Sequence, residues 1–369
     1  MNKVFKTIGL VISALVLLIA ICWIGVAIFV TYNKEYLRNK LVEIIEKRTG
    51  AKAEIKEVSS SILKTFPFVS VQISGISLRD SMYSQHHHDL FHAEQVFLRA
   101  SPASLITRKR IGKILIRSGS LYLLTDSSGY TNNYVLKGKP DAEKKEGSSL
   151  PDISLESFQV ELANLPRNKH YKGFVSKLDC SIDDDGTGRK DIKLKADLQV
   201  AGIGFNTRKG YFIKDTRVRS TMRVLFNEKE ESLHFTNLVL NLNDEPVTFT
   251  GNFDLGRKTQ DFSLDITAPK ANYSRLVKFL PAKLQKLLNR YSITSPVELS
   301  VHVVGKTSRN VEPRVTAQMI ARGNDVSVPD LDLTDCSFTA VYDNQKDSTK
   351  EISDANSIIT FTDVKAKYA

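Results

Sequence analysis

Cysteine is scarce in this sequence, which contains Cys22, Cys180 and Cys336 in 369 residues. Cys22 falls inside an apolar run, so two cysteines far apart in the sequence are left outside it. Such a pair excludes a disulfide framework, and the absence of any Cys-x-x-Cys pair excludes the common zinc and thioredoxin-like motifs. We interpret Cys180 and Cys336 as small buried hydrophobic residues.

Motifs for catalysis and for phosphate binding are also missing. The sequence has no Gly-x-Ser-x-Gly and no His-Glu-x-x-His, and Gly202-Ile203-Gly204 with Gly210 lacks the Lys-Ser/Thr of a P-loop. The acidic run Asp183-Asp184-Asp185-Gly186 does not have the spacing of an EF-hand and instead predicts a hairpin turn. We therefore predict a protein that is not an enzyme and uses no cofactor.

One cluster has metal-ligand chemistry: His86-His87-His88-Asp89, followed by His92. On a helix, His88 and His92 would lie on one face, and Asp89 or His86 could supply a third ligand. The alternative is a solvated loop between two strands. We predict no metal site and keep His86, His88 and His92 as weak candidates.

Charged side chains are absent between Lys6 and Lys34, and the apolar run at residues 8–30 is long enough to cross a hydrocarbon core about 30 Å thick. A cleaved signal peptide is the alternative, because Lys3 and Lys6 precede the run. Signal-peptide cores span only about 7 to 15 residues, and a cleavage site at Gly25-Val26-Ala27 would lie late within this one. We predict an uncleaved anchor at residues 1–33.

The orientation of this anchor is not decided by the flanking charges. The basic residues that follow the span outnumber those before it, which opposes the positive-inside rule. Large folded domains, however, are translocated largely regardless of flanking charge.

Residues 34–50 have the period of an amphipathic helix. Leu37, Leu41, Ile44 and Ile45 share one side with Arg48, and Gly50 is suited to end the helix. From Ala53 onward, apolar residues alternate with polar ones, and at Gly75 the alternation changes phase, as at a β-bulge. Turn signals between these runs predict about fifteen antiparallel strands.

Two further segments interrupt the strand pattern. Residues 274–290 keep a helical period, although Pro281 should kink or divide the helix. Residues 140–149 are polar and without period, and are a candidate linker. The fold class is therefore mainly β, with an N-terminal anchor, a short amphipathic helix and one further short helical segment.

A sheet of this size needs cover for its apolar face. It is either a sandwich or barrel that covers itself, or an elongated curved sheet whose concave apolar face holds lipid chains. The sequence pattern does not separate these architectures.

The formal net charge of +11 allows a nucleic acid, an anionic membrane surface or a solvated exterior as its explanation. The densest basic group, Arg108-Lys109-Arg110 with Lys113 and Arg117, has no aromatic residues for base stacking, so we predict no nucleic-acid partner. Attraction to anionic lipid head groups stays an open alternative, and solvation of the outer sheet face is favoured.

The order of motifs resembles one family. An anchor and a helix ending in Thr49-Gly50 precede a Phe-Pro and alternating valines at residues 59–81. Residues 93–133 then contain Ser-Leu-Ile, Ile-x-x-Ile-x-Ile-x-x-Gly and Gly-x-x-Asn, and residues 246–281 lead into a Leu-Pro. This pattern resembles the AsmA-like proteins of Gram-negative bacteria, which are related to TamB and to chorein-type bridge-like lipid-transfer proteins.

The resemblance implies a single-pass inner-membrane protein with a cytoplasmic N-terminus and a periplasmic AsmA-like β-groove at residues 51–369. Its implied role is to carry phospholipids for outer-membrane biogenesis and envelope homeostasis, with acyl chains as the ligand and residues 8–30 in the inner membrane. The alternative is a scaffolding envelope protein whose sheet forms a self-covered sandwich and binds other envelope proteins. The chain also ends within strand-like sequence, so we expect a C-terminus that is truncated relative to longer relatives.

The candidate lipid-groove residues are the alternating apolar residues of the predicted strands. They are Val69, Val71, Ile73, Val96, Leu98, Ile114, Ile116, Leu194, Leu198, Leu238, Leu240, Phe249, Leu264 and Ile266.

Overall fold

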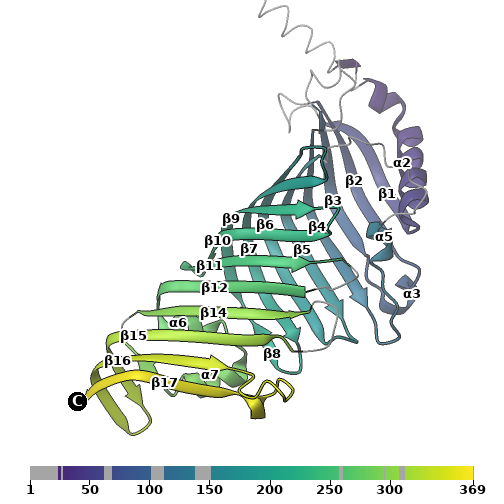
Figure 1. Ribbon diagram of the computed structural model, residues 1–369. Helices are drawn as coiled ribbons and strands as arrows, with labels where there is room; N and C mark the ends of the chain where they lie inside the picture. Colours follow the sequence, from purple (N-terminus) through teal and green to yellow (C-terminus); the bar gives the residue numbers. More distant parts are fainter. Residues whose placement is uncertain are drawn as a thin grey trace, which may run out of the picture. The chain divides into compact units, whose positions relative to one another are not determined.

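A computed structural model describes residues 24–25, 28–61, 69–100, 112–137, 151–256, 261–294, 296–306 and 312–368. The fold is mainly β, with 17 mostly antiparallel strands and a few short helices among the described residues (Figure 1). The candidate linker at 140–149 and most of the predicted span at 8–30 lie outside these residues. Within the described part, no helix is both long and apolar enough to cross a membrane.

The chain divides into two compact units, Met1–Glu161 and Leu162–Ala369. In the first unit, each strand from β1 to β4 pairs antiparallel with the next. The elements that begin in this unit are α2 (Lys34–Thr49), β1 (Lys52–Ser61), β2 (Val69–Arg79), α3 (Tyr83–His86), β3 (Phe91–Ala100), β4 (Lys113–Thr125), α5 (Tyr134–Lys137) and β5 (Asp152–Asn164).

Helix α2 occupies the segment predicted as an amphipathic helix and lies along β1 (Figure 1). It ends where Gly50 takes the left-handed conformation (φ 74°) and donates its N–H to the carbonyl of Glu46. Leu37, Leu41, Val42 and Ile45 pack against the apolar face of β1 to β4. Ile44 was expected on this side but is 41% exposed, because the packed face is rotated toward Val42.

Gly75 changes the phase of β2 as predicted, since Ile73 and Ile76 are three residues apart and are both buried in one cluster. No residue is inserted, however, because β2 keeps a constant register with both β1 and β3. The partners of these residues on β3, Val96 and Ala93, show the same spacing, so the adjacent strands change phase together. The expected bulge is instead a left-handed residue (φ 61°) within an unbroken register.

Replacing Gly75 with alanine is expected to destabilise β2 by about 1–2 kcal/mol, because a side chain disfavours the left-handed conformation. The new Cβ would also lie 2.5 Å from Cδ of Lys56, which must move. Faster hydrogen exchange of residues 69–79 in the full chain measures this loss. Gly112→Ala is the matched control, since its new Cβ would lie 3.9 Å from the carbonyl oxygen of Arg99, an ordinary contact. Equal exchange of residues 69–79 in the two variants would contradict the prediction.

In the second unit, most strands pair antiparallel with the next strand in sequence. Strand β9 pairs with β7 beyond the short β8, β12 pairs with β14, and β13 pairs with β15. The strands are β6 (Lys169–Asp184), β7 (Arg189–Asn206), β8 (Gly210–Phe212), β9 (Thr216–Asn227), β10 (Ser232–Leu242), β11 (Glu245–Asp254), β12 (Asp261–Ala271), β13 (Ser292–Ile293), β14 (Val297–Lys306), β15 (Arg314–Val328), β16 (Leu331–Asp343) and β17 (Ile358–Tyr368).

No pairing among the described residues joins β17 back to β6, so the sheet of this unit is open rather than a closed barrel. The acidic run at residues 183–186 lies at the β6–β7 hairpin, as predicted: Asp183 and Asp184 end β6, and Gly186 is left-handed in the turn that follows.

The helical segment predicted at 274–290 is divided at Pro281, as its sequence indicates. Helix α6 (Tyr273–Lys278) begins at Asn272, whose side chain accepts a hydrogen bond from the N–H of Arg275. Helix α7 (Ala282–Leu288) follows the proline. The prediction of one further helical segment omitted α3, α5 and the 3-10 turn at Asp354–Asn356, which are each too short to show a period.

Neither of the two cysteines outside the predicted span, Cys180 and Cys336, is in a disulfide. Cys336 is buried, as predicted, and burial raises the pKa of its thiol. Cys180 is half-buried.

Candidate functional site

The second unit carries rows of apolar side chains that cross its strands. Residues that are directly opposite on neighbouring strands share a face of the sheet. The strand register brings one apolar residue opposite another from β10 to β17. We call the longest row the central lane. It consists of Leu238, Phe249, Ile266, Val301, Ala317, Tyr342 and Ile359.

Two more lanes lie on either side of the central lane, two residues away along each strand. The helix-side lane consists of Ala268, Leu299, Met319, Ala340 and Phe361. The far lane consists of Gly251, Leu264, Val303 and Val315. Because the lanes run perpendicular to the strands, they form an apolar track along the length of the sheet.

The α6 segment, which comprises α6 and its C-cap residue Phe279, covers this face unevenly. Phe279 packs in one cluster with Ala268, Val247 and Leu242, all of which are almost fully buried. In the central and far lanes, Val301, Leu264 and Val303 are only half-buried. At β17, Ile359 is 59% exposed and Phe361 is 58% exposed. The apolar face therefore becomes more accessible with distance from α6.

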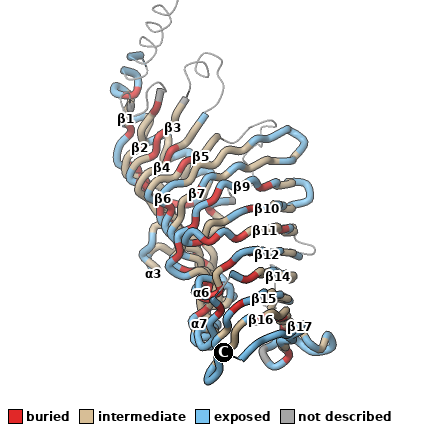
Figure 2. The backbone as a smooth tube through the Cα atoms, turned by 90° about the vertical axis from the view of Figure 1, so that its left-hand side faces the viewer, coloured by how far each residue is buried: buried red, intermediate tan, exposed pale blue. Residues whose placement is uncertain are grey.

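The opposite face of this sheet is polar. Buried and exposed residues alternate along β9 (Figure 2). Val218 and Val224 are buried, while Arg217 and Arg223 are exposed. These arginines form ion pairs across the strand pair, from Arg223 to Asp191 at 2.8 Å and from Arg217 to Asp197 at 2.6 Å. In these two pairs, the basic residues of the outer face are matched by carboxylates and so add nothing to the net charge.

The ion pairs on this outer face affect the titration of its carboxyls. Hydrogen bonds from Arg223 and Arg217 lower the pKa of Asp191 and of Asp197 from the ordinary aspartate value. A lowered pKa in the folded state means that the pairs stabilise the sheet above the unfolded pKa, and that this contribution is lost as the pH falls through the folded pKa. Both arginines are well exposed, so each contribution is small.

The first unit arranges its candidate residues in the same way. Opposite pairs join Val71 to Leu98 and Leu98 to Ile114, and a second row joins Ile73, Val96 and Ile116. The side chains of α2 pack against this same cluster. In this unit, the apolar face is therefore partly covered by the helix that follows the predicted anchor.

The structure separates the candidate groove residues by accessibility. Ile73, Val96 and Leu238 are at most 8% exposed and act as core residues. The half-buried candidates are Val71, Leu98, Ile114, Ile116, Leu194, Leu198, Leu240, Phe249, Leu264 and Ile266. The side chain of Val69 lies outside the part of the chain that the structure describes. The sequence pattern identified which residues share a face, but it missed the continuation of the lanes onto β14 to β17.

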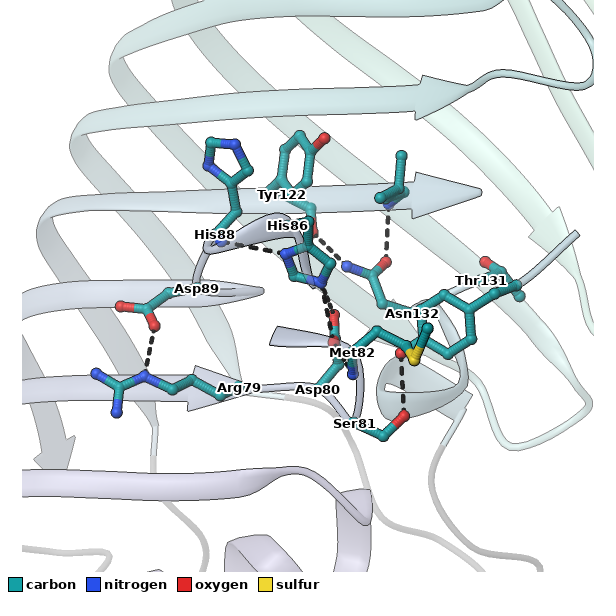
Figure 3. Close-up of polar contacts among 12 residues, drawn as sticks. Arg79, Asp80, Ser81, Met82, His86, His88, Asp89, Tyr122, Thr131 and Asn132 are labelled. Atoms are coloured by element: carbon teal, nitrogen blue, oxygen red, sulfur yellow. Dashed lines mark hydrogen bonds and ion pairs between the residues drawn. The ribbon is translucent and has the colours of Figure 1, made fainter. Parts of the chain in front are cut away.

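The histidines do not assemble into a metal site. His86 Nε2 lies 3.0 Å from Oδ1 of Asp80 (Figure 3). His92 Nδ1 instead lies 2.9 Å from Oγ of Ser77 on the neighbouring strand. Helix α3 ends at His86 and His92 lies in β3, so the helical spacing considered for His88 and His92 is not realised. Among the described residues, no group of three or more His, Cys, Asp or Glu side chains could hold a metal ion.

Near these histidines, Asn132 is fully buried and joins two parts of the chain (Figure 3). Its Oδ1 accepts a hydrogen bond from the N–H of Leu124 at 2.8 Å, and its Nδ2 donates to the carbonyl of Tyr122 at 3.0 Å. The neighbouring turn is closed by Asp126, whose Oδ1 accepts from Ser128 and Tyr130. The Gly-x-x-Asn pattern at residues 129–132 is thus a structural lock on β4.

Comparison with known proteins gives one family. The model of the AsmA family matches residues 1–165. This range contains the whole of the first unit, whereas the lanes of the second unit lie beyond it. No curated protein matches the chain in sequence.

Proposed function

Since residues 1–165 form an AsmA family domain, we propose that the chain is a membrane-anchored, non-enzymatic conduit for phospholipids in the cell envelope. The family is linked to lipid transport in the envelope. In this proposal, residues 8–30 anchor the chain in the inner membrane, the N-terminus is cytoplasmic, and the sheet extends into the periplasm to serve outer-membrane biogenesis.

The observation that carries this proposal is the continuous apolar track formed by the three lanes, most of whose side chains are half-buried. Apolar surface shielded from water stabilises a complex by about 25 cal/mol per Å². An acyl chain lying along the central lane would cover side chains such as Val301 and Ile266, while its head group stays in water at the edge of the open sheet. Transport along such a track requires no nucleophile and no cofactor.

Aliphatic side chains also suit movement along the track. The central lane places Ile266, Val301 and Ala317 opposite one another, without a charged side chain among them. A charge or an unpaired polar group would create a barrier for an acyl chain, because it would have to lose its hydration. A uniform apolar surface therefore supports sliding rather than tight binding at one point.

The alternative of a self-covered sandwich receives less support. All strand pairings of the second unit that we describe belong to a single sheet, and its apolar face is covered by the α6 segment rather than by a second sheet. A scaffolding role would need another envelope protein to cover the lanes.

Photo-crosslinking tests the proposal directly. A photoreactive residue at Leu240 or at Leu198 of the detergent-extracted full chain is expected to yield phospholipid adducts by mass spectrometry. Val239 is the matched control for Leu240, because it is the adjacent apolar residue on the opposite face and is 40% exposed. Equal adducts at Leu240 and Val239, or no phospholipid in the purified protein, would contradict the conduit.

A further inference from the structure

Helix α7 exposes apolar side chains that the lanes do not use. Leu284 is 41% exposed and Leu287 is 50% exposed, and Tyr291 just beyond the helix is 38% exposed. None of the residues of α7 is buried. In contrast, Tyr273 and Val277 of α6 are buried and pack against Ile293 and Val297. Helix α6 is therefore the covering helix, and α7 presents its leucines to the outside.

The same segment is strongly basic. No acidic residue occurs between Asp265 and Glu298. The charged residues in this interval are Lys270, Arg275, Lys278, Lys283, Lys286 and Arg290. Arg275 pairs with Glu245 at 3.2 Å, but within the described ranges no ion pair involves Lys283, Lys286 or Arg290. This differs from the outer sheet face, where arginines are matched by carboxylates.

The basic and apolar side chains of α7 are adjacent. At 100° per residue, Lys283 and Lys286 lie on one side of the helix, Leu284 and Leu287 lie on the neighbouring side, and Leu288 turns inward to the cluster of Val277. A helix with exposed leucines flanked by lysines is typical of elements that lie in a membrane interface.

Hydrogen bonds hold α7 in place on α6. The side-chain amide of Gln285 donates to the carbonyls of Lys278 at 3.1 Å and of Leu280 at 2.7 Å. The hydroxyl of Tyr273 donates to the carbonyl of Leu288 at 3.0 Å. The exposed side chains are therefore presented on a fixed support rather than on a free segment.

We propose that α7 is a docking element for the surface of an anionic phospholipid bilayer. The lysines would contact lipid phosphates, and Leu284 and Leu287 would enter the boundary between head groups and acyl chains. Unmatched positive charge beside exposed leucines favours a bilayer over an acidic protein. An acidic protein would pair with the lysines, but it would not offer the leucines an apolar layer like the acyl chains of a bilayer. The proposal concerns a surface outside the lanes and does not require lipid to lie in them.

Vesicle flotation tests this docking. The full chain is placed in nanodiscs of phosphatidylcholine, so that its predicted anchor is already occupied, and is mixed with acceptor vesicles. The expected result is co-flotation with vesicles of equimolar phosphatidylcholine and phosphatidylglycerol, and much weaker co-flotation with vesicles of phosphatidylcholine alone. Each basic residue near such a surface raises the affinity for the vesicles about fivefold. The double variant Lys283→Gln with Lys286→Gln should therefore bind these vesicles roughly thirtyfold more weakly.

Two further variants make the outcome decisive. Lys229→Gln with Lys365→Gln removes the same charge from exposed positions elsewhere in the second unit and should bind like the unmodified chain. Leu284→Ala with Leu287→Ala should weaken binding about tenfold or more, because apolar surface is no longer buried. If the α7 lysine pair binds like its control, or if the leucine pair has no effect, bilayer docking by α7 is wrong, and an acidic protein becomes the better occupant. Crosslinking at Leu240 is unaffected by these variants and reports separately on the conduit.

Discussion

Replacing Val301 with aspartate is expected to reduce phospholipid transfer at least tenfold. Val301 lies in the middle of the central lane, opposite Ile266 on one side and Ala317 on the other. A carboxylate at this point would have to lose hydration whenever an acyl chain passes, which costs several kcal/mol. Because Val301 is half-buried, the carboxylate can stay hydrated in the empty sheet, so the fold should persist.

The measurement is the transfer of a fluorescent phospholipid from proteoliposomes that carry the full chain to acceptor vesicles. Ser300→Asp is the matched control, since this neighbouring residue is exposed on the opposite face and the variant has the same charge change. Transfer by Val301→Asp at the unmodified rate, with an unchanged circular dichroism spectrum, would show that acyl chains do not use the central lane.

Replacing Asn132 with alanine is expected to destabilise the end of β4 by about 2–4 kcal/mol. The variant would leave the N–H of Leu124 and the carbonyl of Tyr122 without the partners that Asn132 supplies, and each unpaired buried group costs about 1–3 kcal/mol. Asn132→Asp should destabilise at least as much, because a carboxylate at this fully buried position would lose its hydration and would face the carbonyl of Tyr122 instead of donating to it.

Hydrogen exchange of residues 113–125 in the full chain measures this loss. Asn133→Ala is the control, because Asn133 is adjacent and only half-buried. Since the lock lies in the first unit, crosslinking at Leu240 in the second unit should not change. If β4 exchanged as slowly in Asn132→Ala as in the unmodified chain, the hydrogen bonds of Asn132 would not be what stabilises the end of β4.

Local sequence patterns predicted the parts of this fold that depend on neighbouring residues. Gly50 ends α2, Pro281 divides α6 from α7, and the run at 183–186 makes a hairpin, because each of these depends on backbone preferences within a few residues. The placement of Ile44 on the packed side of α2 was predicted incorrectly, because the rotation of a helix against a sheet is set by packing over its whole length.

The candidate site also has a part that local sequence patterns predicted and a part that they did not. Alternation identified Leu264 and Ile266 as members of one face, since side chains along a strand point to opposite sides in turn. It did not identify Val301, Ala317 and Tyr342 as their continuation, because that depends on the register between strands. The four histidines between residues 86 and 92 are close in sequence, yet His86 and His92 bind different partners on different elements.

By itself, the sequence determined that this protein is a β-rich chain with an apolar run at residues 8–30, one alternating apolar face and an AsmA-type N-terminal pattern. The first three of these properties follow from composition and from periods that each segment carries alone, whereas the AsmA-type pattern is a resemblance in the order of motifs. Only the tertiary structure decided that the second-unit sheet stays open, that the lanes are continuous from β10 to β17, and that α6 covers one side of them while α7 faces outward. Those features arise from strand register and helix packing, which join residues too far apart in the chain for a local pattern to specify.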